Sequence, residues 1–464
     1  MKATATTLLM GIIALLSVAV AWMYYPRIEV QDEVVRETLL AEEDFFEPVD
    51  VKSIKIANFD RNTNSPAELE LQLEDGSWNI REHESYPANN IPLVAEAVTA
   101  LRDKKVLDVV SDNKDDHESY GVLELSEMGS TGLGVGTVIT YAGKNDKQLA
   151  KLIVGRSPER EPGQRFVRLA GQPQIYTVEF NPEILTSNFS DWVDGKLVNV
   201  GGGQIPLPNL IEYVLVDMYF RDQSSDKKYN YRAKVRRSED AGWVYDLWEP
   251  DENKQISAEP TEEALPAREF TLANLLKQVL VVEIEDVIRK QQAAAVDLAN
   301  PNETQPATHF DSLKERGFFH TGFNNGQHQF EAAAGSITIA LRIGMEIHIY
   351  VGNMTGLGGS GSGKISRALM LSASYNPELF PMPKEADFEN ASGENAEDDA
   401  AQEAEGDPKR DYQVALKERE EALEYAKQEV RAFNQLHADW IYEVPDESVS
   451  LLLPVADAWK NTAK

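Results

Sequence analysis

The sequence predicts an α+β protein with an N-terminal transmembrane helix and two tandem modules, each of mainly antiparallel sheet with one packed helix. Three observations predict this fold class: an uncharged apolar segment at the start, landmarks that recur in two halves of the chain, and hairpin-length connections between alternating strands. The expected boundaries are a signal anchor at 1–27, an acidic stalk at 28–49, the first module at 50–198, a Gly/Pro linker at 199–209 and the second module at 210–460.

The N-terminal segment predicts the compartment. From Ala3 to Pro26 the chain carries no charge, and its core LLMGIIALLSVAVAW is continuously apolar. About 20 such residues span a bilayer, and flanking basic residues such as Lys2 stay in the cytoplasm. We expect a single-pass anchor in the cell (inner) membrane, with a cytoplasmic N-terminus and the bulk of the chain extracytoplasmic. Because Ala19-Val20-Ala21 resembles a signal-peptidase site, cleavage after Ala21 is the open alternative.

Composition excludes several classes of protein. The 45 basic and 77 acidic side chains give a net charge of −32, a field that repels nucleic acid. We therefore expect no nucleic-acid partner. The 464 residues include no cysteine, which excludes disulfides, thiolate catalysis and thiolate metal sites, and which fits an oxidising compartment.

Six landmarks occur in the same order in both halves of the chain. They are an alternating strand, a turn leading to tryptophan, an amphipathic helix, a first glycine, a strand that ends in a second glycine, and a hairpin segment that leads to a final tryptophan. The two glycines are 34 residues apart in the first copy and 35 in the second. The first copy has Val51, Trp78, the helix face Val94, Ala97, Val98 and Leu101, then Gly121, Gly155 and Ile175 to Trp192; the second has Ile211, Trp243, the helix face Leu272, Leu275, Leu276 and Val279, then Gly317, Gly352 and Ile441 to Trp459. We interpret Trp78 and Trp243 as seeds of the two cores.

The glycine-rich stretch GLGGSGSGK, from Gly356 to Lys364, looks like a phosphate-binding loop. A phosphate loop leads from a strand into a helix, whose N-terminal amides hold the anion. Here the next segment, ISRALMLSAS, alternates like a strand, and Ile365 stands where a hydroxyl would be needed for magnesium. We therefore expect a hairpin connection and no nucleotide between Gly356 and Lys364.

The second copy carries an insertion before its last hairpin strand. Acidic low-complexity sequence at 383–407 predicts disorder, and a helix is expected at 408–438. Apolar residues follow a heptad seam along this helix, at Leu416, Leu423, Ala426, Val430 and Phe433. The seam predicts either packing on its own module or a contact with a membrane-protein partner.

These landmarks resemble a bacterial family known as domain of unknown function 4340. The matching residues are Gly76-Ser77-Trp78, Tyr120-Gly121-Val122, Ile153-Val154-Gly155 and Ile175-Tyr176-Thr177-Val178. Val122 replaces the usual leucine, and the insertion in the second copy departs from the family pattern. The resemblance implies a membrane-anchored extracytoplasmic protein, often encoded beside gliding-type ABC transporter components. No catalytic residue is known for the family, so none is carried over.

Chemistry-bearing motifs are scarce. The histidines form no H-E-x-x-H pair, although His320 and His328 flank a turn that could present both to one metal. We interpret that turn as solvated. Oxygen ligands for calcium gather at Asp112, Asp115, Asp116 and Glu118, but without the glycine and spacing of a calcium loop, which favours a charged surface loop.

We therefore expect no catalytic, cofactor-binding or metal-binding residues and no cofactor. The expected function is that of a non-enzymatic scaffold or accessory subunit of an envelope complex, possible partners being gliding-type ABC transporter components. An extracytoplasmic ligand-binding module, for polysaccharide or calcium, is the alternative, and a hydrolase is the third interpretation.

Overall fold

The computed structural model describes residues 38–450 apart from gaps inside that range. The gaps are residues 42–43, 62, 103, 130–131, 199, 201–206, 223–226, 239–241, 249–258, 267–283, 302–303, 305–306, 325, 358–364 and 386–407. The predicted anchor at 1–27, the predicted helix face from Leu272 to Val279 and nearly all of the acidic insert at 383–407 lie outside the described residues. Within them, no helix has the length and apolar character needed to cross a bilayer.

The first module contains a nine-stranded sheet of order β4-β3-β2-β1-β6-β7-β8-β9-β5. Every neighbouring pair of its strands is antiparallel. Neighbouring residues of a strand face opposite sides of a sheet, so Ile139 and Leu152 belong to the main core on one face, whereas Val138 and Ile153 belong to a smaller buried cluster on the other. The strands are β1 (Ser53–Asp60), β2 (Ser65–Glu74), β3 (Ser77–Ile80), β4 (Tyr86–Pro87), β5 (Val106–Ser111), β6 (Thr137–Ala142), β7 (Gln148–Val154), β8 (Gln164–Leu169) and β9 (Ile175–Glu179).

The second module contains a nine-stranded antiparallel sheet of the same order, β13-β12-β11-β10-β17-β18-β19-β20-β14. It differs by an added two-stranded sheet, β15-β16, between the fifth and sixth strands of the repeat. An identical strand order is what a duplication of one module requires. The strands are β10 (Ile211–Asp222), β11 (Lys227–Ser238), β12 (Gly242–Trp248), β13 (Glu262–Pro266), β14 (Asp286–Arg289), β15 (Phe318–Asn324), β16 (Gln327–Ala332), β17 (Gly335–Leu341), β18 (Met345–Leu357), β19 (Ile365–Tyr375) and β20 (Trp440–Pro445).

Few helices accompany the sheets, so the α+β class with mainly antiparallel strands is confirmed. In the first module, Val94, Ala97 and Leu101 of the predicted helix face are buried. The α-helices are α2 (Ile91–Thr99), α3 (His117–Tyr120), α4 (Phe189–Trp192), α5 (Leu207–Leu210), α7 (Gln292–Ala299), α8 (Asp311–Lys314), α10 (Pro408–His437) and α11 (Asp446–Ser450), and the 3-10 helices are η2 (Pro48–Asp50), η3 (Lys114–Asp116), η4 (Leu125–Glu127), η5 (Lys144–Asp146), η6 (Pro182–Leu185), η8 (Ala307–Phe310) and η9 (Pro377–Leu379).

The paired glycines of the two modules mark the same close approach of two backbone segments. A Cβ on Gly155 would lie 2.4 Å from the Tyr120 carbonyl oxygen, and one on Gly352 would lie 2.3 Å from that of Arg316. In each module the residue after this glycine donates its backbone N–H to the same carbonyl, at 3.0 Å in the first and 2.8 Å in the second. The recurring glycine spacing therefore has a steric cause, because only glycine leaves room for this contact.

The expectation about the two tryptophans needs correction. Trp78 and Trp243 are only partly buried and pack against the core, whereas the fully buried Trp192 lies inside it. Within the expected stalk, Thr38 bridges to Lys105 and Leu39 is buried against the first module. Within the expected linker at 199–209, Val200 is buried in the core and the helix α5 begins at Leu207. Aromatic size alone did not reveal which tryptophan is central.

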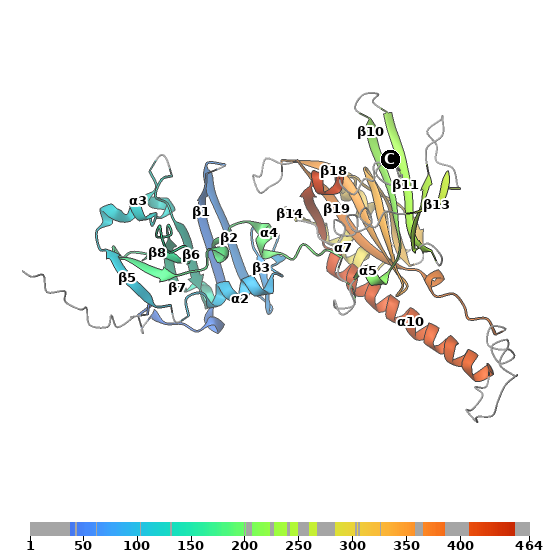
Figure 1. Cartoon of the computed structure of the whole chain (residues 1–464), viewed down its shortest axis with the longest axis horizontal. Coiled ribbons are helices and arrows are strands. Elements are labelled where there is room, and N and C mark those ends of the chain that lie inside the picture. Colours follow the sequence, from blue (N-terminus) through green and yellow to red (C-terminus); the bar gives the residue numbers. More distant parts are fainter. Residues whose placement is uncertain are drawn as a thin grey trace, which may run out of the picture.

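The two modules lie one after the other along the longest axis of the molecule (Figure 1). Strands β3 and β4 of the first sheet face β14 and β20 of the second, and buried residues of both modules belong to one continuous hydrophobic core. The helix α10 runs from this region away from the second sheet.

Candidate functional site

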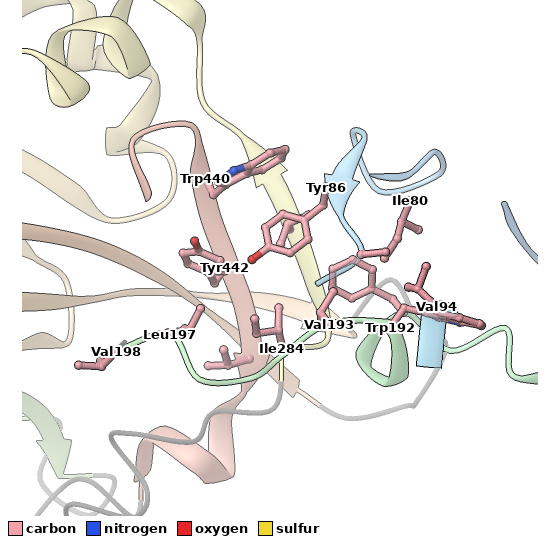
Figure 2. Packing of buried hydrophobic residues seen from close by; sticks show 14 of the residues in the cluster. Ile80, Tyr86, Val94, Trp192, Val193, Leu197, Val198, Ile284, Trp440 and Tyr442 are labelled. Atoms are coloured by element: carbon pink, nitrogen blue, oxygen red, sulfur yellow. The ribbon is translucent and has the colours of Figure 1, made fainter. Parts of the chain in front are cut away.

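The junction between the modules is a cluster of aromatic rings. Tyr86 of β4 packs against Trp440 and Tyr442 of β20, as Figure 2 shows. Its ring centroid is 4.9 Å from that of Trp440, 6.3 Å from that of Tyr442 and 5.7 Å from that of Phe189 in α4, each in an edge-on arrangement. Such pairs add to the stabilisation that burial alone gives. The modules are thus joined by packed side chains as well as by the chain itself.

A histidine–carboxylate contact lies beside these rings. His83 of the first module contacts Asp286 of β14, with 2.6 Å between Nδ1 and Oδ1. The His83 ring also stacks on Phe189 at 4.3 Å, which fixes its orientation. Both side chains are half-buried, so water screens the contact and its contribution to stability is modest. The contact links a loop of the first module to β14 of the second.

A buried polar network continues from the junction into the second module. The Tyr442 ring packs edge-on against Tyr86, and the Tyr442 hydroxyl lies 2.6 Å from His437 Nδ1. Lys290 donates from Nζ to the carbonyl oxygens of His437 at 3.0 Å and Ala438 at 3.1 Å. Burial lowers the pKa of Lys290 to about 7 and that of His437 to about 3, and raises that of Tyr86 to about 12. The imidazole and the phenol are therefore neutral at pH 7.

The helix α10 is attached to the second module through its C-terminal half. Ala426, Val430 and Phe433 are buried, and the Asn434 side chain accepts from the Ala373 backbone N–H at 2.7 Å and donates to its carbonyl at 2.9 Å. The Asn434 amide thus makes the two hydrogen bonds to Ala373 that a neighbouring strand would make with β19. This half of the predicted heptad seam packs on its own module.

The N-terminal half of α10 is more exposed. Leu416 and Leu423 of the seam are half-buried, and Val414 keeps 47% of its surface in water. Arg419 attaches this half of the helix to the segment after β19, because its Nε donates to the Phe380 carbonyl oxygen at 2.7 Å. Figure 1 shows this half extending from the module as an arm. We call residues 408–423 the arm.

The most unusual ionisable cluster is a chain of Asp297, His328 and His320. Asp297 Oδ2 of α7 lies 3.0 Å from His328 Nε2 of β16, and His328 Nδ1 lies 3.1 Å from His320 Nε2 of β15. Asp297 and His328 are each 4% exposed, and Phe310 packs on both imidazoles. The turn itself is solvated as expected, since Thr321, Asn324 and Gly326 are exposed, but the flanking His328 is buried and His320 is half-buried beside the Phe310 ring.

The surroundings of the cluster favour uncharged imidazoles. Burial lowers the pKa of His320 and His328, and the Asp297 carboxylate opposes this effect without cancelling it. Across the described ranges of the chain, no three histidine or carboxylate side chains converge on one point as a metal site requires.

The structure also describes the acidic stretch at 112–118 and the strands on either side of the glycine-rich stretch. Asn113 caps Asp115, and Asp116 accepts from Ser111 at 2.6 Å, so the acidic stretch forms a capped turn in which Asp112, Asp115 and Glu118 are exposed. The glycine-rich stretch joins β18 to β19, which pair antiparallel with Leu357 opposite Ile365. The predicted hairpin connection is confirmed, and the residues 358–364 themselves lie outside the described part.

Sequence reasoning missed the junction and the partner of the histidines. Tyr86 and Trp440 are 354 positions apart, and each looks like any strand aromatic. Asp297 lies in QQAAAVDLA, where its place on the apolar side of a short helix was an available signal.

The fold and the junction define a duplicated α+β protein whose two modules share one core. A family model for a domain of unknown function (DUF4340) matches residues 78–301, which span most of the first module and the start of the second. Residues 78–301 therefore belong to this family, which confirms the resemblance drawn from the glycine and tryptophan motifs. No curated protein and no solved structure matches the chain.

Proposed function

We propose that this protein is a non-enzymatic scaffold or accessory subunit of an envelope complex, anchored in the inner membrane by residues 1–27 with the modules outside the cytoplasm. The observation that carries the proposal is the aromatic junction of Tyr86, Trp440 and Tyr442, which packs two modules into one body. A scaffold needs such a fixed geometry, because its partners bind at a set distance from each other.

The arm of α10 is the part that this body presents. Its seam residue Leu423 and its exposed Val414 lie beyond the segment that packs on β19. We propose a helix of a membrane-protein partner as its contact, since heptad seams pair with other helices. The family resemblance favours the permease or ATPase components of a gliding-type ABC transporter as the complex concerned.

Site-specific photo-crosslinking in cells tests this function. A photoreactive residue at Val414 should give crosslinks to an inner-membrane permease subunit. Val109 is a matched control, since it is 58% exposed but lies on β5 of the first module. We expect no such crosslink from Val109. If neither Val414 nor any other arm position crosslinks to a membrane protein, while the chain is present at normal level, the scaffold proposal is wrong.

A further inference from the structure

A cleft of about 550 Å³ lies in the first module beside the junction. One wall is the tip of the β1–β2 hairpin, and the other is formed by His83 and residues 187–189. The walls are tied together by the Ser187 hydroxyl, which donates to Asn58 Oδ1 at 3.2 Å. This volume is within the range of small-molecule sites, which is about 300–1,000 Å³.

The charges of the cleft are balanced. Glu68 is paired with Lys55 at 2.6 Å, and His83 is paired with Asp286. The lining also includes Asp60 and Arg61, whose formal charges are of opposite sign. A site of this kind selects neither anions nor cations, although the whole chain carries −32.

The lining offers both donors and acceptors. Asn58 and Asn188 carry amide groups, each with a donor and an acceptor, and Thr63 and Ser65 carry hydroxyl groups. The Phe59 ring supplies an apolar surface of the same cleft. Hydroxyl groups both donate and accept, and the C–H faces of sugar rings pack on aromatic rings.

We infer that this cleft binds a neutral, hydroxyl-rich ligand, that is, a saccharide without charged substituents. The inference goes beyond the scaffold role and does not depend on it. His83 lines the cleft and also contacts Asp286 of the second module. A bound saccharide would therefore contact a side chain that links the two modules. Ligand and junction are thereby placed next to each other.

Calorimetry on the full-length chain tests the site. The protein is kept in a zwitterionic detergent, because glycoside detergents would compete, and is titrated with maltohexaose, cellohexaose and chitohexaose, and with hexagalacturonate as the charged comparison. We expect one or more of the neutral oligosaccharides to bind, and hexagalacturonate to bind at least tenfold more weakly.

Paired variants locate the binding. The double variant Arg61→Ala/Asn188→Ala should weaken the neutral oligosaccharide at least tenfold, since both side chains are exposed in the lining. Arg102→Ala is the matched control, because Arg102 is an exposed arginine at a separate cleft of about 180 Å³. It should leave affinity unchanged, and equal melting temperatures should show that all variants are folded.

Three outcomes would each overturn the inference. They are binding of none of the neutral oligosaccharides, preferred binding of hexagalacturonate, and equal effects of the two sets of variants.

Discussion

At the scale of single residues, the glycines that recur in the two modules are fixed by backbone contact. Gly155→Ala would place a methyl group 2.4 Å from the Tyr120 carbonyl oxygen, and backbone cannot swing aside as a side chain can. We expect a loss of about 1–3 kcal/mol in the free energy of unfolding, the usual cost of overpacking. Gly163→Ala is the control, because nothing lies within 4 Å of its added carbon. Chemical denaturation should show the control within about 1 kcal/mol of the parent, and equal stabilities of the two variants would contradict the steric reason.

His437 makes the fold sensitive to acid. Burial, reinforced by the nearby Lys290, lowers its pKa to about 3, so the folded state holds it neutral while the unfolded chain protonates it near pH 6.5. Its contribution to stability is therefore complete above pH 6.5 and is lost progressively as the pH falls toward 3. The loss for one such proton is at most about 1.4 kcal/mol per pH unit.

Denaturation at several pH values measures this effect. His437→Gln keeps a polar group beside the Tyr442 hydroxyl and has no proton to gain. Its free energy of unfolding should fall less steeply between pH 6.5 and 4 than that of the parent. Parallel pH profiles would show that His437 does not titrate on unfolding in this range.

At the scale of elements, the C-terminus of α10 is held by Lys290, which directly follows β14. Lys290 is buried and donates to the carbonyls of His437 and Ala438, which an α-helix leaves without internal partners. Lys290→Met should cost about 1–3 kcal/mol, the penalty for unpaired buried groups.

The matched control for this variant is Lys427→Met. Lys427 of the same helix pairs with Glu424 and lies 5.7 Å from the Tyr375 ring, and such partly exposed contacts contribute at most about 1 kcal/mol each. Hydrogen exchange should show faster exchange in the last turn of α10 for Lys290→Met and not for Lys427→Met. Unchanged protection of that turn would contradict the capping role.

At the scale of the whole molecule, the junction couples the unfolding of the two modules. Tyr86 packs on Trp440, Tyr442 and Phe189, so Tyr86→Ala removes the centre of the cluster. We expect a cost of about 3–5 kcal/mol, as for other buried large aromatics. The single thermal transition of the parent should separate into two, one for each module. A variant that still unfolds in one transition would show that the modules are coupled elsewhere.

Much of each module was open to prediction from the sequence, and the contacts between elements were not. Alternation gave the strands on both sides of the glycine-rich stretch, and the spacing of Gly155 and Gly352 reflects a real backbone contact. Periodicity reports which face of an element is buried, but not against what. For this reason Tyr86 could not be paired with Trp440, nor Asp297 with His328, before the fold placed them together.

The rigid joining of the modules is tested most directly by a distance between them. The chain has no cysteine, so spin labels can be placed at introduced cysteines, one for Val109 in the first module and one for Met354 in the second. Both positions are more than half exposed, at 58% and 57%. Double electron–electron resonance should give one narrow distribution of distances between the two labels, and Tyr86→Ala should broaden it. A broad distribution in the parent chain would mean that the modules move independently, and would contradict the scaffold built on their junction.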